Sequence, residues 1–108
     1  MKRGDIVTVS APGDYGKPRP AVVIQSDRLA GGDSVLVALL TSTLTDTPFY
    51  RLQVDPEDSN GLRLPSQVMI DKILAYPRGK CGPVIGRLSE GQLTALGNLL
   101  SLMIGLAD

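Results

Sequence analysis

Apolar and polar positions divide the chain into several short strand-like runs followed by one helical run. Residues 5–10 alternate between the two kinds, as half-buried strands do, and 21–25 and 35–40 are short apolar runs rich in β-branched residues, typical of buried strands. The run at 35–40 is apolar at every position, which predicts a central strand. Further strands are predicted at 49–54, at 67–70 and 73–76 as one strand or two, and at 84–86.

The last twenty residues have the periodicity of a helix. Ser89 at the N-cap, with Gln92 three residues later, fits a capping box, and the helix is predicted to run to about Leu106. Leu99, Leu102 and Leu106 lie partly off the main stripe and widen the apolar face beyond one core contact, which predicts a second contact with a partner. The main apolar stripe is formed by Leu93, Leu96, Leu100 and Met103.

Many short strands followed by one helix predict a fold that is mainly β with one C-terminal helix, built on a compact and strongly bent antiparallel sheet. The length of 108 residues predicts a single domain over residues 1–108. An apolar content of 43% favours a folded globule over a disordered tail.

Charge and residue usage narrow the function classes. Eleven basic and eleven acidic residues give a net charge of zero, so nucleic-acid binding would need a local basic patch. One candidate patch runs from Lys72 to Arg87, because no acidic residue lies between Asp71 and Glu90. The chain has no histidine and one cysteine, Cys81, which excludes histidine-based catalysis, a cysteine metal cluster and an intrachain disulfide. With no signal-peptide pattern and no apolar run of membrane-spanning length, we expect a cytoplasmic protein without membrane contact.

A stiff loop leads into the second predicted strand over residues 15–24. Pro18 and Pro20 bias Lys17 and Arg19 toward extended backbone, and the missing N–H of Pro20 predicts that the sheet ladder begins only after it. The Arg19 guanidinium is thereby held at the mouth of a strand, a placement suited to a phosphate or a carboxylate. A surface arginine that caps a turn is the alternative interpretation.

Three segments in this order resemble the MazF/PemK family of toxin endoribonucleases. They are Arg-Gly-Asp-Ile-Val at 3–7, Arg-Pro followed by apolar residues at 19–24, and Leu-Leu-Thr-Ser at 39–42. The resemblance implies a small SH3-like barrel of the MazF/PemK/CcdB type and a homodimer. It implies a sequence-specific endoribonuclease that cleaves single-stranded mRNA without metal or cofactor and so inhibits translation. The implied partners are RNA and a cognate antitoxin, with DNA contacted only through the antitoxin.

RNA cleavage of this kind uses the substrate's own 2′-hydroxyl as nucleophile, so the protein must supply a base and stabilise charge on the phosphoryl oxygens. Without histidine, a carboxylate is the expected base. By resemblance, Arg19 and Thr41 contact the phosphate and Asp71 is the base. Thr41 can instead cap its own loop. Asp71 can instead be a strand-end aspartate paired with Lys72 or Arg78. The family arginine two residues before the acid is replaced here by Met69.

The loop Ala11–Pro20 is shorter than the family pattern and lacks its Gly-x-Glu-Gln segment. Asp14 is therefore a second candidate base, or a turn former beside Gly13, and Tyr15 is a candidate for stacking on a nucleobase. The residues expected to bind RNA are Lys17, Ser42, Tyr15, Lys72, Arg78 and Lys80.

Two other functions fit the predicted fold. A CcdB-like gyrase poison would bind a topoisomerase without nuclease activity, but those proteins use a tryptophan near the C-terminus, and this chain has none. A non-catalytic SH3-like binding module would need an aromatic groove, for which the chain has only three tyrosines and one phenylalanine. A lysine such as the neighbouring Lys80 can lower the pKa of the Cys81 thiol, but the chain has no histidine to activate it, so Cys81 is interpreted as incidental.

Overall fold

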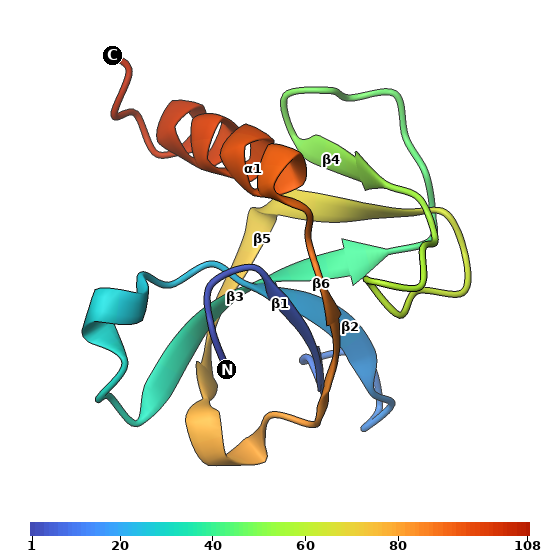
Figure 1. Ribbon diagram of the computed structural model, residues 1–108, viewed down its shortest axis with the longest axis vertical. Helices are drawn as coiled ribbons and strands as arrows, with labels where there is room; N and C mark the ends of the chain where they lie inside the picture. Colours follow the sequence, from blue (N-terminus) through green and yellow to red (C-terminus); the bar gives the residue numbers. More distant parts are fainter.

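The computed structural model describes residues 1–108 and contains one six-stranded antiparallel sheet, followed by one α-helix (Figure 1). The order of strands across the sheet is β4-β5-β3-β2-β1-β6, so the predicted central strand does have a neighbour on each side. The elements are β1 (Asp5–Val9), β2 (Arg19–Val23), η1 (Asp27–Leu29), β3 (Ser34–Thr41), β4 (Arg51–Val54), β5 (Ser66–Pro77), η2 (Arg78–Lys80), β6 (Val84–Arg87) and α1 (Glu90–Met103). The prediction of a mainly β fold with a C-terminal helix is confirmed.

Alternating side chains of the sheet build two hydrophobic clusters, one on each face. Ile6, Val22 and Leu40 belong to the cluster that α1 covers, and Leu96 of the helix is fully buried there. Val7, Val9 and Val37 point the other way, into the bend of the sheet. Figure 1 shows α1 lying across β4 and β5, while β1, β2 and β6 curve away beneath it. The cluster inside the bend needs no second helix because the sheet curls over it.

The curl has a local cause in β5. Residues 67–70 and 73–76 form one strand, but its register against β3 jumps from Val68 opposite Leu40 to Ile73 opposite Ala38. Extra residues on β5 therefore face Leu39 alone, as a bulge, and bulges bend a strand and increase its twist. Asp71 lies in this bulge and not at the end of a strand as the sequence suggested.

The pairing of β2 begins after Pro20 on only one of its two sides. β2 begins at Arg19, earlier than predicted, because Arg19 and Pro20 already pair with Val9 and Thr8 of β1. Pairing with β3 begins later, at Ala21 opposite Leu39. The prediction that the ladder starts after Pro20 therefore holds for β3 and is wrong for β1.

Helix α1 begins as predicted and ends early. Ser89 and Gln92 form the capping box in both directions. The helix stops at Met103 because Gly105 adopts φ 81°, and the amides of Gly105 and Leu106 donate back to the carbonyls of Leu102 and Ser101, which is a Schellman ending. No helix in the structure combines the length and apolarity needed to cross a membrane.

The β4–β5 loop, residues 55–65, is held tightly against β6. The buried Asn60 side chain accepts hydrogen bonds from the amides of Glu57 and Leu62 and donates to the carbonyl of Asp55. Gly61 and Gly86 lie at the contact between loop and strand, where neither leaves space for a β-carbon. This close approach fixes the position of the residues that follow Gly61.

Gly86→Ala should destabilise the protein by about 1–3 kcal/mol, because the added methyl would overlap the backbone of Asn60. Gly79→Ala is the matched control, since its methyl would meet no atom within 4 Å. Urea unfolding of both variants measures the difference. Equal stability of the two variants would show that the loop does not depend on this contact.

Candidate functional site

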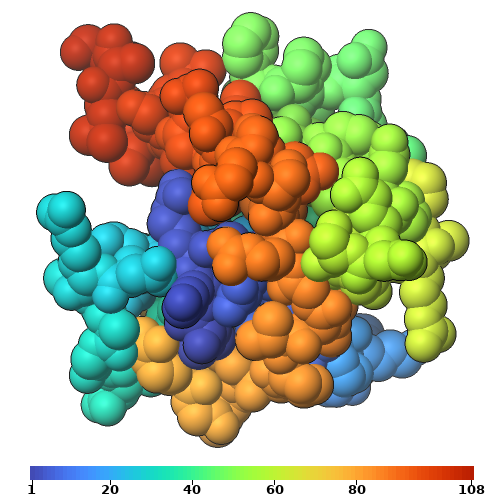
Figure 2. Space-filling view, in the orientation of Figure 1, coloured from blue at the N-terminus to red at the C-terminus, as the bar shows by residue number.

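A cleft of about 610 Å³ opens at the edge of the sheet where β2 and β5 begin and β3 ends. Antiparallel pairing puts Ala21 opposite Leu39, so Arg19 and Thr41, each two residues further along, meet at the same edge. The β1–β2 loop (residues 10–18, blue) and the β4–β5 loop (green to yellow-green) approach this edge on the same side of the molecule (Figure 2). The polar side chains that line the cleft are Thr8, Arg19, Thr41, Ser42, Thr43, Arg63 and Ser66, and no acidic residue lines it.

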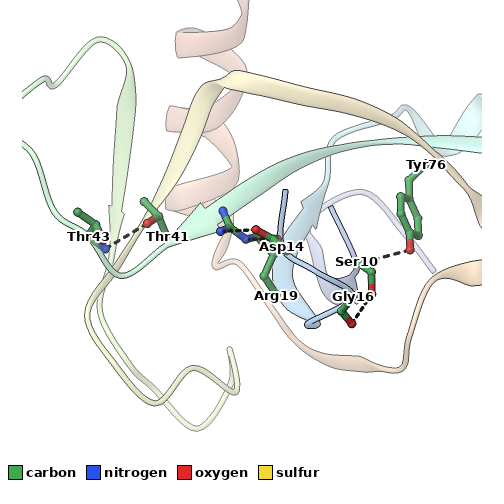
Figure 3. Close-up of polar contacts among 7 residues, drawn as sticks. All are labelled: Ser10, Asp14, Gly16, Arg19, Thr41, Thr43 and Tyr76. Carbon is green, nitrogen blue, oxygen red and sulfur yellow. Dashed lines mark hydrogen bonds and ion pairs between the residues drawn. The ribbon is translucent and has the colours of Figure 1, made fainter. Parts of the chain in front are cut away.

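Arg19 is held by an ion pair with Asp14 of the β1–β2 loop (Figure 3). Nη2 donates to Oδ1 at 3.0 Å, and Nε lies 2.8 Å from Oδ2. Both carboxylate oxygens therefore face the guanidinium, and Oδ2 is buried. The pairing occupies one edge of the guanidinium, and Nη1 donates to no group of the chain, so part of its donor capacity remains for a ligand.

The β1–β2 loop carries Asp14 on an unusual backbone. Tyr15 adopts φ 52° between Gly13 at 88° and Gly16 at 79°, and a bulky residue in this region is strained. Tyr15 is 98% exposed, so nothing packs its ring. Ser10 anchors the base of the loop, because its hydroxyl donates to the carbonyl of Gly16 and its amide donates to the Tyr76 hydroxyl (Figure 3).

Thr41 caps its own loop, as one interpretation of the sequence proposed. Its Oγ1 accepts a hydrogen bond from the amide of Thr43 at 3.1 Å (Figure 3). A hydroxyl that accepts in this way keeps its own hydrogen for donation. The cap therefore orients Thr41 without removing its ability to contact a phosphate oxygen.

The structure brings together only part of the predicted site. Arg19, Thr41 and Ser42 line the main cleft, while Tyr15 and Lys17 line a smaller depression of about 370 Å³ that shares Arg19 with it.

Four predicted site residues line neither cavity, because the bulge and the length of β3 separate them from Arg19. Asp71 and Lys72 are exposed in the bulge of β5, and Asp71 forms no ion pair with Lys72 or Arg78. The Arg78 guanidinium donates to the backbone carbonyls of Gly32 and Ser34. Ser34 begins β3 and Thr41 ends it, a separation of roughly 23 Å along a strand. Lys80 is exposed in η2, beyond Arg78.

Arg63 and Ser66 line the cleft but were missed in the sequence. Arg63 follows the Asn60-Gly61 turn and its side chain forms no ion pair or hydrogen bond, while the Ser66 hydroxyl donates to the carbonyl of Leu64. The alternation of Leu62, Arg63 and Leu64 was the available signal. It could not show that the polar position faces the mouth of a cleft formed by β2 and β3.

Cys81 lies outside the cleft. Burial raises the pKa of the Cys81 thiol, and the nearby Arg78 guanidinium opposes this shift without cancelling it. The expected lowering of the pKa by a neighbouring lysine is therefore wrong, and the thiol is less reactive than an exposed one.

Comparison with known proteins identifies the family. Residues 2–104 match the family of PemK-like, MazF-like toxins of type II toxin-antitoxin systems. A probable endoribonuclease MazF from Mycolicibacterium smegmatis is 40% identical over 108 residues, covering 99% of each chain. The structure of the Mycobacterium tuberculosis toxin MazF-mt6 matches with a TM-score of 0.80 and 25% identity, over 94% of this chain and 96% of that one. A mycobacterial endoribonuclease in complex with its cognate antitoxin shares the fold at a TM-score of 0.82 and 19% identity, over 98% and 96% of the two chains. The chain belongs to the PemK-like, MazF-like toxins of type II toxin-antitoxin systems.

Proposed function

We propose that the chain is the toxin of a toxin–antitoxin pair and acts as a metal-independent, sequence-specific endoribonuclease on single-stranded mRNA. The observation that carries this proposal is the cleft, which combines Arg19, Arg63, several hydroxyl groups and no acidic lining residue in a chain of zero net charge. Such a surface attracts a phosphodiester backbone. The family membership and the named activity of the 40% identical relative support the same reaction.

In the proposed reaction, the ribose 2′-oxygen attacks the adjacent phosphorus while the bond from phosphorus to the 5′-oxygen breaks. The 2′-hydroxyl proton goes to a carboxylate, and a solvent water protonates the departing 5′-oxygen. Arg19 stabilises the charge that grows on the phosphoryl oxygens, and Thr41 donates its hydroxyl hydrogen to one of them. The products are a 2′,3′-cyclic phosphate and a 5′-hydroxyl.

Asp14 is the carboxylate that we propose for the proton, because it lies against Arg19, the residue that we propose for the scissile phosphate. The Asp14 Oδ2 atom is buried, so the β1–β2 loop must open before a ribose can reach it. Pro18 and Pro20 stiffen only the end of this loop, whereas Gly13, Gly16 and the strained Tyr15 let its first part change backbone conformation at low cost. Asp71 remains the alternative base.

The partners that we propose are a cognate antitoxin and a second copy of the chain, in the cytoplasm where mRNA is available. The dimer is supported by exposed apolar side chains at the end of α1. Leu102 is 45% exposed, Ile104 61% and Leu106 73%. Exposed apolar side chains that are close together in this way are typical of a surface that binds another protein. Leu99, predicted to lie off the core stripe, packs against the core instead. We therefore propose that the two-fold interface lies at the C-terminal end of α1 and at the residues that follow it.

The purified chain should cleave a long mixed-sequence single-stranded RNA in excess EDTA. No group of three or more acidic or cysteine side chains lies close enough to hold a metal, and the proposed reaction needs none. Treatment of the fragments with acid, and then with phosphatase, should reveal a cyclic phosphate at their 3′-ends. Activity that disappears in EDTA and returns with magnesium would contradict the proposed mechanism.

Arg19→Lys should lower kcat by about 10²–10³-fold, because an ammonium keeps the charge but loses the fork that contacts both Asp14 and a phosphate. Arg28→Lys is the control, since Arg28 is exposed in η1 and away from the cleft. Asp14→Asn should also lower kcat, whereas Asp71→Asn should not. If Asp71→Asn lowered kcat and Asp14→Asn did not, Asp71 would be the base.

Light scattering across a dilution series should give the mass of a dimer at tens of micromolar, a concentration on the order of a weak dissociation constant. Leu102→Lys combined with Leu106→Lys should yield a folded monomer. A matched double variant in the loop before β4, Leu44→Lys with Phe49→Lys, should remain dimeric because it changes exposed apolar residues elsewhere. A dimeric helix variant would place the interface on another surface.

A further inference from the structure

The cleft contains a second arginine with no structural partner. Arg63, in the β4–β5 loop, lines the same cleft as Arg19, and its guanidinium takes part in neither of the two ion pairs of the chain and in none of its hydrogen bonds. Arg19 differs, because Asp14 already neutralises it. The uncompensated positive charge of the cleft is therefore that of Arg63.

The backbone that carries Arg63 is fixed on both sides. Before it, the buried Asn60 side chain closes the β4–β5 loop, and Gly61 packs directly on β6. Leu62 packs against the core that α1 covers. After it, the Ser66 hydroxyl donates to the carbonyl of Leu64. A cation on a rigid base loses less conformational entropy on binding than one on a mobile loop.

The cleft that both arginines line suits part of a nucleotide chain. The volume of about 610 Å³ lies within the range of about 300–1,000 Å³ that is usual for small-molecule sites. Leu62, Leu64 and Ile85 give the cleft an apolar wall, and Thr8, Ser42 and Ser66 add hydroxyl groups. An occupant with one phosphate at Arg19 carries another phosphate one nucleotide away along its backbone, and each is a target for an arginine fork.

We propose that Arg63 binds an RNA phosphate next to the scissile one and so anchors the substrate across the cleft, while Arg19 serves the scissile phosphate. This assignment rests on the proposed endoribonuclease function. Arg63 is then a binding residue and not a catalytic one: it lowers the dissociation constant of the RNA complex. Because Arg63 has no acidic partner to release, RNA meets this charge before the pair between Asp14 and Arg19 has to open.

The test compares Arg63→Gln with Arg28→Gln, two exposed arginines that lose the same charge, only one of which lines the cleft. The probe is a fluorescent oligonucleotide that spans the mapped cleavage site and has 2′-deoxyribose at the cleaved position, so that it binds without reacting. Arg63→Gln should weaken binding about tenfold. It should also make the slope of log affinity against log salt shallower by about 0.7, the value for one phosphate contact on a single strand. Arg63→Lys should restore the salt slope, because it restores the charge.

Cleavage kinetics separate binding from chemistry. Arg63→Gln should raise KM and leave kcat close to that of the wild type. Equal effects of the two glutamine variants on affinity and slope would overturn the proposal, and so would a loss of kcat at unchanged KM, which would place Arg63 at the scissile phosphate. A wild type that binds RNA without cleaving it would refute the proposed function while the binding comparison still decides the role of Arg63. A wild type that binds no RNA would refute both.

Discussion

The pairing of β3 with its two neighbours is the constraint on which the rest of the molecule depends. Val35, Val37, Ala38 and Leu40 are buried on alternating faces, so a slip of one residue would exchange the two cores. The register is therefore strongly specified, and it determines which side chains meet at each end of the sheet. Arg19 and Thr41 share one end because β2 and β3 are antiparallel, and Arg78 binds the other end of β3.

The cleft that results has two walls of different stiffness. The β4–β5 loop is closed by Asn60 and packed on β6 through glycines, so it behaves as an extension of the sheet. The β1–β2 loop is joined to the body mainly through Ser10 and through the ion pair of Asp14 with Arg19. A partly exposed ion pair contributes little to stability and breaks at low cost. The flexible loop therefore carries Asp14, the base that we propose, and the rigid loop carries Arg63, which we propose to bind RNA.

The charge distribution shows why a neutral chain can serve an anionic substrate. Eleven acidic residues balance eleven basic ones overall, yet none of the acids lines the cleft. Asp14 neutralises Arg19 from the side of the loop, which leaves the Arg63 guanidinium as the open charge. Net charge describes the whole surface, whereas binding depends on the charges that share one cavity.

The sequence by itself determined the elements and the family, because both depend on local patterns. Alternation, continuous apolar runs and the capping box at Ser89 specify strands and a helix over neighbouring residues. The Arg-Pro segment and the Thr-Ser strand end pointed to Arg19 and Thr41, which line one cleft in the structure. Only the tertiary structure decided which charged residues join them. Asp71 and Lys72 lie in the bulge of β5, outside the cleft. The Arg78 guanidinium donates to a backbone carbonyl beside the far end of β3. The β4–β5 loop, distant in the sequence, places Arg63 in the cleft. Such choices depend on the register between strands and on the close packing of Gly61 and Gly86, which no pattern of neighbouring residues encodes.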